Sequence, residues 1–191
     1  MNRMWLAFGF AIALAAGASV NAASPGPTDD IVVHVEKDGS AVRVRVDCPV
    51  DAPRAVAWEV LTDYEHMASF VSNLDQSVVR LRLGDRAQVY QKGHASRGPL
   101  SISFENVREV ELVPQSEVRS RIISGDTMPA QFTTRIEERG GRLHITHIGV
   151  YTPKMWVPPM IGTGLIEDET RKQYGQIRDE ILRRKAKSGA P

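Results

Sequence analysis

The stretch from Gln76 to Pro153 alternates apolar and polar residues almost throughout. A period of two residues is typical of a β-strand with one buried face. Turn sequences divide the stretch at Gly84-Asp85, Arg97-Gly98-Pro99, Pro114-Gln115, Ser124-Gly125-Asp126 and Gly140-Gly141. Because the connections are this short, the pattern predicts six consecutive strands in an antiparallel meander.

A shorter pair of alternating runs precedes the meander. The apolar members are Ile31, Val33 and Val35 in the first run, and Val42, Val44, Val46 and Cys48 in the second. Asp38-Gly39 between the runs tolerates the positive φ angles of a tight turn, so an antiparallel hairpin is predicted. Cys48 falls on its apolar face, where we expect a buried, unreactive thiol.

Two short helices are predicted after the hairpin. Asp51-Ala52-Pro53 offers an N-cap oxygen and a first-turn proline to a helix that ends near Leu61. Thr62 and Glu65 have the spacing of a capping box, which predicts a second helix that ends near Phe70. Asp63 and Tyr64 at this junction are expected to cap and pack, with acid/base chemistry as the alternative.

A long helix is predicted after Pro158-Pro159. Its apolar stripe consists of Ile166, Thr170, Tyr174, Ile177 and Ile181. The opposite, solvent-facing side carries Asp168, Arg171, Lys172, Arg178 and Asp179. Favourable i,i+4 ion pairs are expected between Glu167 and Arg171, Asp168 and Lys172, and Glu180 and Arg184.

This order of elements predicts an α+β fold, in which a curved antiparallel sheet wraps around the long C-terminal helix and leaves room between them. The chain resembles the helix-grip (START-like) superfamily and, within it, the polyketide cyclase/dehydrase and coenzyme Q-binding group. The residues that carry the resemblance are Asp51-Ala52-Pro53, Val56 to Glu65, Phe70-Val71, Tyr90 to Gly93 and Ser101 to Phe104. The match extends from about Ile31 to Arg184.

The resemblance implies a helix-grip fold but not one activity, because the superfamily includes carriers, enzymes and chaperone-like modules. In such a fold the core and the cavity wall are the same surface, so core residues are the candidate ligand contacts. The predicted ligand-binding residues are Phe70, Leu100, Ile102, Phe104, Phe132, Ile145, His147, Tyr151, Trp156, Met160 and Ile166. His147 could orient a carbonyl or phenol, and Trp156 with Met160 suits a deformable cavity lip.

Composition narrows the partners. The chain has 24 basic and 23 acidic residues, a formal net charge of +1, which gives no long-range field for nucleic acid. A single cysteine rules out an internal disulfide. We expect a hydrophobic small molecule or lipid as partner, no nucleic acid, and no stable membrane insertion; the sequence identifies no protein partner.

The N-terminus predicts export. Arg3, the apolar run from Trp5 to Ala16 and the small residues before Ala23 are typical of a secretory signal peptide cleaved after Ala22. The predicted organisation is a signal peptide over 1–22, a flexible leader over 23–30, a START-like domain over 31–186 and a disordered tail over 187–191. The location would be periplasmic or secreted.

The sequence contains no nucleophile elbow, phosphate-binding loop, zincin motif or complete dinucleotide fingerprint. His144 and His147 are three apart on a strand, so they point to opposite faces and cannot chelate one ion. We therefore predict no catalytic residues, no metal and no cofactor.

The leading hypothesis is an extracytoplasmic START-like protein that binds an apolar or amphipathic small molecule, such as a lipid or an isoprenoid or quinone-like compound, between sheet and helix. One alternative is a cyclase/dehydrase- or hydrolase-like enzyme that uses His147 or the pair Tyr90 and His94. A filled-core module that acts through protein partners is the other alternative, which polar residues at concave positions favour: Thr134, Arg135, Thr146 and His147.

Overall fold

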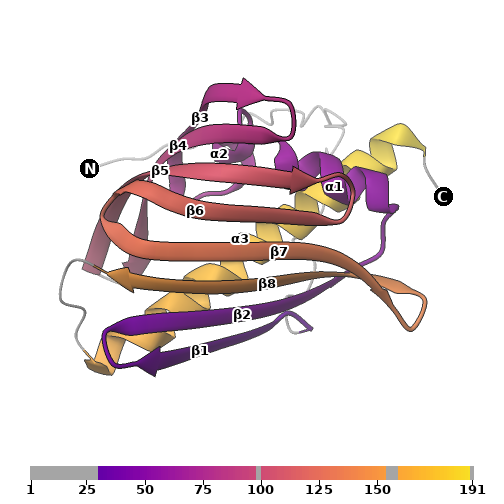
Figure 1. Cartoon of the computed structure of the whole chain (residues 1–191). Helices are drawn as coiled ribbons and strands as arrows, with labels where there is room; N and C mark the ends of the chain where they lie inside the picture. Colours follow the sequence, from indigo (N-terminus) through magenta and orange to yellow (C-terminus); the bar gives the residue numbers. More distant parts are fainter. Residues whose placement is uncertain (1–29, 98–99, 154–158, 190–191) are drawn as a thin grey trace, which may run out of the picture.

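The computed structural model describes residues 30–97, 100–153 and 159–189. Its elements follow the order β1 (Val32–Asp38), β2 (Ala41–Val50), α1 (Arg54–Thr62), α2 (Met67–Phe70), β3 (Leu74–Leu83), β4 (Arg86–Arg97), β5 (Leu100–Val113), β6 (Glu117–Gly125), β7 (Thr127–Arg139), β8 (Arg142–Pro153) and α3 (Pro159–Ser188) (Figure 1). The predicted order of hairpin, two short helices, six strands and long helix is confirmed.

All eight strands form one antiparallel sheet in the order β1-β2-β8-β7-β6-β5-β4-β3. The sheet curves, and α3 lies along one of its faces, which we call the inner face (Figure 1). Gly39 and Gly84 have φ angles of 59° and 58° in two of the hairpin turns, a conformation that costs other residues more. The hairpin turns connect the strands that are consecutive in the chain, whereas the pairing of β2 with β8 is a long-range contact.

The inner face carries the apolar half of each alternating run. Along β2, for example, Val42, Val44, Val46 and Cys48 are all buried. Burial raises the pKa of the Cys48 thiol to about 12, so the thiol stays protonated and unreactive at neutral pH. The hydrophobic core lies between this face and the predicted stripe of α3, of which Tyr174, Ile177 and Ile181 are buried.

One side of α3 differs from the prediction. Arg178, expected on the solvent-facing side, is buried and donates hydrogen bonds to Asp30 Oδ1 at 2.6 Å and to the Pro49 carbonyl at 3.5 Å. Arg171 on the same side donates to the Ile31 carbonyl. The chain at the start of β1 packs against this side of the helix, a long-range contact that helical periodicity does not reveal.

The predicted helix caps are wrong. Helix α1 begins after Pro53, without a side-chain cap, and Asp51 lies outside the helix. The Thr62 hydroxyl donates back to the Trp58 carbonyl at 2.8 Å instead of capping α2, whose N-cap is His66. Thr62 is still inside α1, so the nearest acceptor for its hydroxyl is a backbone carbonyl in the preceding turn of the same helix.

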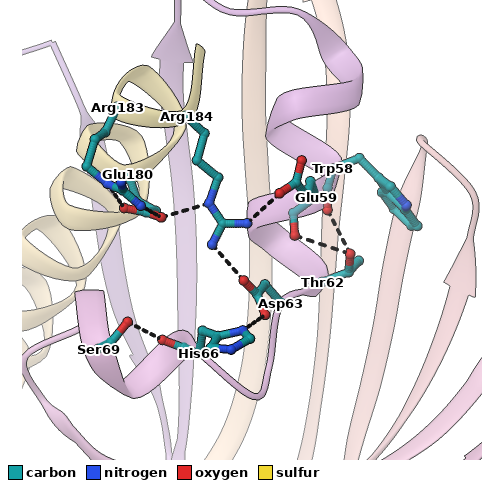
Figure 2. Close-up of polar contacts among 9 residues, drawn as sticks. All are labelled: Trp58, Glu59, Thr62, Asp63, His66, Ser69, Glu180, Arg183 and Arg184. Carbon is teal, nitrogen blue, oxygen red and sulfur yellow. Dashed lines mark hydrogen bonds and ion pairs between the residues drawn. The ribbon is translucent and has the colours of Figure 1, made fainter. Parts of the chain in front are cut away.

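Arg184 near the C-terminal end of α3 connects that helix to both short helices (Figure 2). Its guanidinium donates to Glu59 at 2.7 Å, to Asp63 at 2.6 Å and to Glu180 at 2.7 Å. Asp63 also bonds the His66 ring, with 2.7 Å between Oδ1 and Nδ1. Asp63 therefore holds the three helices together, which is a structural role, although not the capping role that the sequence suggested.

We expect Asp63→Ala to lower the free energy of unfolding by about 1.5–3 kcal/mol, because it removes hydrogen bonds to a charged, largely enclosed partner. Glu59→Ala is the matched control: Glu59 binds the same arginine but its side chain is 65% exposed. The control should cost about 0–1 kcal/mol. Urea denaturation measures both, and equal losses would contradict this account of the cluster.

The effect of Asp63→Ala on the free energy of unfolding should depend on pH. Burial opposes the ionisation of Asp63, but the hydrogen bonds from Arg184 and His66 outweigh it and hold its pKa below the usual value. The carboxylate therefore stabilises the fold fully above its unfolded pKa of about 3.9, and the contribution is lost as the pH falls through the lower folded value. The gap between wild type and Asp63→Ala should accordingly narrow below about pH 4.

Candidate functional site

A cavity of about 310 Å³ lies between the inner face of the sheet and α3. Strands β4 to β8 form its floor, α3 one wall, and the segment from the end of α1 to the start of β3 another. Its lining comprises Leu61, Tyr64, Met67, Asn73, Leu74, Gln91, Phe104, Asn106, Arg108, Val118, Ser120, Ile122, Phe132, Thr134, His147, Tyr151, Gln173, Tyr174 and Ile177. The inner face is thus not filled, which counts against the filled-core hypothesis.

Among the described residues, the wall combines apolar and aromatic side chains with uncharged polar ones and a single arginine, and includes no aspartate or glutamate. This is the composition of many small-molecule sites, where apolar area supplies affinity and a few polar groups fix orientation. The volume lies at the small end of such pockets, which span about 300–1,000 Å³. The volume is of the order of a single-chain or single-ring-system molecule.

Phe132 occupies the cavity floor because its neighbour across β7 and β8 is Gly149. A Cβ at Gly149 would lie 2.7 Å from the Phe132 ring, closer than atoms pack. The glycine lets the ring lie flat over β8, where it stacks on His147 with 5.8 Å between ring centroids and 19° between the planes. This pair forms the aromatic centre of the floor.

His147 is joined to a short polar chain. Its Nδ1 lies 2.9 Å from the Thr134 hydroxyl, and Thr134 is also hydrogen-bonded to the Tyr174 side chain. Burial, and secondly the positive charge of Arg108, lower the pKa of His147 to about 4. The imidazole is therefore neutral at neutral pH.

Arg108 projects from β5 into the same cavity. Its Nε donates to Asn106 Oδ1 at 3.4 Å, and its guanidinium carbon lies 5.5 Å from the centre of the Phe132 ring. Burial lowers its pKa, with Tyr64 and Tyr174 acting in the opposite direction, but an arginine remains charged at any physiological pH. Among the described residues Arg108 forms no ion pair with a carboxylate.

At the end of the cavity near β3, one buried polar atom has no hydrogen-bond partner within the described residues. The Asn73 Oδ1 atom is buried and accepts no hydrogen bond within the described protein. The Asn73 backbone comes close to β4 because position 93 is glycine: a Cβ there would lie 2.1 Å from the Asn73 carbonyl oxygen. A buried acceptor of this kind is costly unless a ligand or water donates to it.

Four of the predicted ligand-binding residues line the cavity: Phe104, Phe132, His147 and Tyr151. Ile145 is fully buried in the core, while Phe70 and Ile166 pack against the core from its edge. Ile102 is half-buried on β5 and does not line the cavity. Trp156 and the side chains of Leu100 and Met160 lie outside the described part of the chain, so their roles stay predictions.

Sequence reasoning missed the polar members of the wall, chiefly Arg108 and Asn106. Their signal was present, because positions 104, 106, 108 and 110 share one face of β5. Along β5, the prediction assigned inward-facing positions only to apolar residues. An arginine on an inward-facing position is an exception to that assignment. Tyr64, assigned to packing, and Tyr174, assigned to the helix stripe, also reach the cavity.

The alternative catalytic pair lies on the other side of the sheet. Tyr90 contacts Arg80, whose guanidinium carbon is 4.4 Å from its ring centre, and His94 Nδ1 lies 3.0 Å from Asp75. Neither residue lines the cavity, whereas Gln91 between them does. Of the two enzyme hypotheses, only the one that uses His147 places a titratable group at the cavity.

The two histidines of β8 point to opposite faces, as predicted. His144 Nδ1 lies 2.7 Å from Asp47 Oδ1, whereas His147 lines the cavity. Within the described ranges, no cluster of three or more histidine, cysteine, aspartate or glutamate side chains could hold a metal ion.

The outer face has a larger hollow of about 630 Å³ across β3 to β7. Four of its five described charged side chains pair with one another, Arg121 with Glu109 and Arg119 with Glu111, and Arg119 also pairs with Glu117. Because these ion pairs satisfy the charges locally, the hollow offers a ligand less than the inner cavity does.

A curved antiparallel sheet that grips a C-terminal helix around a cavity defines the START-like (helix-grip) fold. Comparison with protein families gives the particular group. The family model described as polyketide cyclase / dehydrase and lipid transport matches residues 50–176, and the chain belongs to this family. No curated protein sequence matches the chain.

Solved structures share the fold at low sequence identity. The Zhui aromatase/cyclase from Streptomyces sp. R1128 is 12% identical with a TM-score of 0.62, over 78% of this chain and 98% of that one. A START superfamily protein from Mycobacterium smegmatis is 12% identical with a TM-score of 0.61, over 74% and 97%. A STAR-related lipid transfer protein from Xanthomonas axonopodis is 10% identical with a TM-score of 0.58, over 78% and 98%.

The described helices include none that is both long and apolar enough to span a membrane.

The pKa of His147 can be tested directly. In an NMR pH titration of the folded protein, its ring should stay neutral from pH 8 to pH 5 and protonate near pH 4. The unfolded chain, with a pKa of about 6.5, takes up the proton first, so the stabilising contribution of neutral His147 is complete above that value and is lost as the pH falls towards 4. A midpoint near 6.5, assigned by comparison with His147→Gln, would show that the ring is not enclosed.

Proposed function

We propose that this protein is exported and binds one small apolar or amphipathic molecule in the cavity between the sheet and α3. The observation that carries the proposal is the cavity itself, lined by aromatic and aliphatic side chains with a few polar groups. Each methylene buried there contributes about 0.8 kcal/mol, enough for tight binding of a single chain or ring system. The fold is shared with a lipid transfer protein and an aromatase/cyclase, which supports a hydrophobic ligand.

Binding is proposed rather than catalysis because the cavity is poorly equipped for proton transfer. The efficiency of a general base is highest when its pKa is near the working pH, and the pKa of His147 is about 4. Its Nδ1 is engaged with Thr134, and no carboxylate lines the described cavity wall to raise the basicity of the ring. The buried tyrosines Tyr64 and Tyr151, with pKa values raised to about 12 by burial, stay protonated.

Export rests on the sequence of residues 1–22, which lie outside the described part of the chain. We expect the exported protein to begin at Ala23, because Val20 and Ala22 have the small side chains that signal peptidase accepts before the cut. Intact-mass measurement of the protein from the culture's extracytoplasmic fraction tests this. Retention of the N-terminal apolar run in the membrane fraction would contradict it.

A cavity-filling substitution tests binding. Ser120 lines the cavity, so Ser120→Phe should occupy part of its volume and weaken binding of the neutral dye Nile red about tenfold or more, since it excludes several buried ligand atoms. Gln131→Phe adds the same ring to the neighbouring exposed outer face and serves as the matched control. Equal dye affinity in the two variants, with both folded by circular dichroism, would contradict binding in the inner cavity.

A further inference from the structure

Arg108 differs from the other enclosed arginines of this protein. Arg178 is paired with Asp30, Arg171 with Glu167, and Arg184 with Asp63, Glu59 and Glu180. Among the described residues, Arg108 has the 3.4 Å hydrogen bond to Asn106 and the face of Phe132, and no carboxylate partner. Its side chain is half-buried, and an arginine cannot neutralise itself by losing its proton. A ligand that fills the cavity would strip water from this charge, which is costly unless the ligand supplies an opposite charge.

The described residues around Arg108 offer no anion. The groups that reach the cavity around it are Tyr64 from the link between α1 and α2, Tyr174 from α3, and His147 and Tyr151 from β8. The tyrosines are protonated and the imidazole is neutral at pH 7, because burial raises the pKa of the tyrosines and lowers that of the histidine. The cavity therefore presents one uncompensated positive charge to its contents.

We propose that the cavity selects an amphipathic monoanion, an apolar chain or ring system that ends in a carboxylate, and that Arg108 binds this carboxylate. The proposal rests on the proposed function and specifies the ligand's charged group. The guanidinium fork matches a carboxylate in geometry, and the uncharged amides and hydroxyls of the wall add no second cation. A phosphate monoester, which carries about −1.5 to −2 charges at pH 7, would be left with excess charge inside the protein.

Four amphiphiles with one shared twelve-carbon chain test the proposal: laurate, methyl laurate, dodecylamine and dodecyl phosphate. Calorimetric titration of the exported protein, below the micelle concentration of each, gives the affinities. We expect laurate to bind about tenfold or more tightly than methyl laurate, the range of a hydrogen bond to a charged group, and dodecylamine to bind least. Dodecyl phosphate should bind less tightly than laurate.

Arg108→Met removes the charge and keeps an unbranched side chain of similar reach. It should abolish the preference for laurate over its methyl ester and leave binding of the ester within about threefold of wild type. Arg108→Lys should keep part of the preference, since it retains the charge without the fork. Arg121→Met on the outer face, which breaks an exposed ion pair with Glu109, is the control and should change neither affinity.

Two further measurements separate a binding role from a structural one. Ligand-free Arg108→Met should melt only slightly below wild type, by about 2–8 °C, because the one described hydrogen bond it removes is the donor to the buried Asn106 Oδ1. A larger fall in melting temperature would show that Arg108 serves the fold, and would overturn the proposal. Neutralisation of Arg108, by laurate or by Arg108→Met, should also raise the NMR-measured pKa of His147, which the arginine charge lowers.

The outcomes separate this proposal from the proposed function. If wild type binds laurate and methyl laurate equally, the carboxylate proposal is overturned while ligand binding stands. Tighter binding of dodecyl phosphate than of laurate overturns the monoanion assignment. If wild type binds none of the four amphiphiles, the proposed function fails, and the proposal about the headgroup fails with it.

Discussion

One long helix, α3, lies along the inner face of an eight-stranded sheet, and the rest of the structure depends on how it is held there. Arginines fix it at several levels: Arg171 and Arg178 bind the start of β1 and the end of β2, and Arg184 binds α1 and the turn after it. Between these attachments the apolar stripe of Tyr174, Ile177 and Ile181 packs on the sheet. One stripe of side chains cannot fill the whole space, and the cavity is what remains.

The cavity wall explains why a ligand rather than solvent is its proposed occupant. A wholly apolar cavity of this size would be a packing defect, and a wholly polar one would hold only water. Here Phe104, Phe132 and Ile177 provide apolar surface, Arg108 has no carboxylate partner among the described residues, and the buried Asn73 Oδ1 accepts no hydrogen bond within them. The protein gives up stability at the Asn73 oxygen, a pattern that is expected where binding, not folding, sets the requirement.

Most of the fold could be predicted from the sequence because it depends on local rules. The meander was predicted by the alternation of apolar and polar residues along Gln76 to Pro153 and by the turn dipeptides. The buried side of α3 was predicted by the helical spacing of Tyr174, Ile177 and Ile181. The errors occurred where a long-range contact decides the outcome. Arg178 is buried because β1 crosses its helix, and no periodicity within α3 contains that information.

The candidate site could be predicted only in part, for a related reason. Its aromatic members lie on apolar strand faces, so Phe104, Phe132, His147 and Tyr151 were found. Arg108 was missed because burial of a charge is the exception to the rule that located the others. Alternation along β5 beyond Phe104 places Asn106 and Arg108 on the same face, but only the structure shows that this arginine lines a cavity whose described wall has no carboxylate.

The central claim is that the cavity holds one small amphipathic molecule when the protein is at work. Native mass spectrometry of the protein purified from the extracytoplasmic fraction of its own source tests it most directly. The account predicts a one-to-one complex whose released ligand, identified by fragmentation, is a single-chain or single-ring-system molecule. A protein that carries nothing under gentle release, and takes up nothing from a total lipid extract of the same cells, would contradict the account.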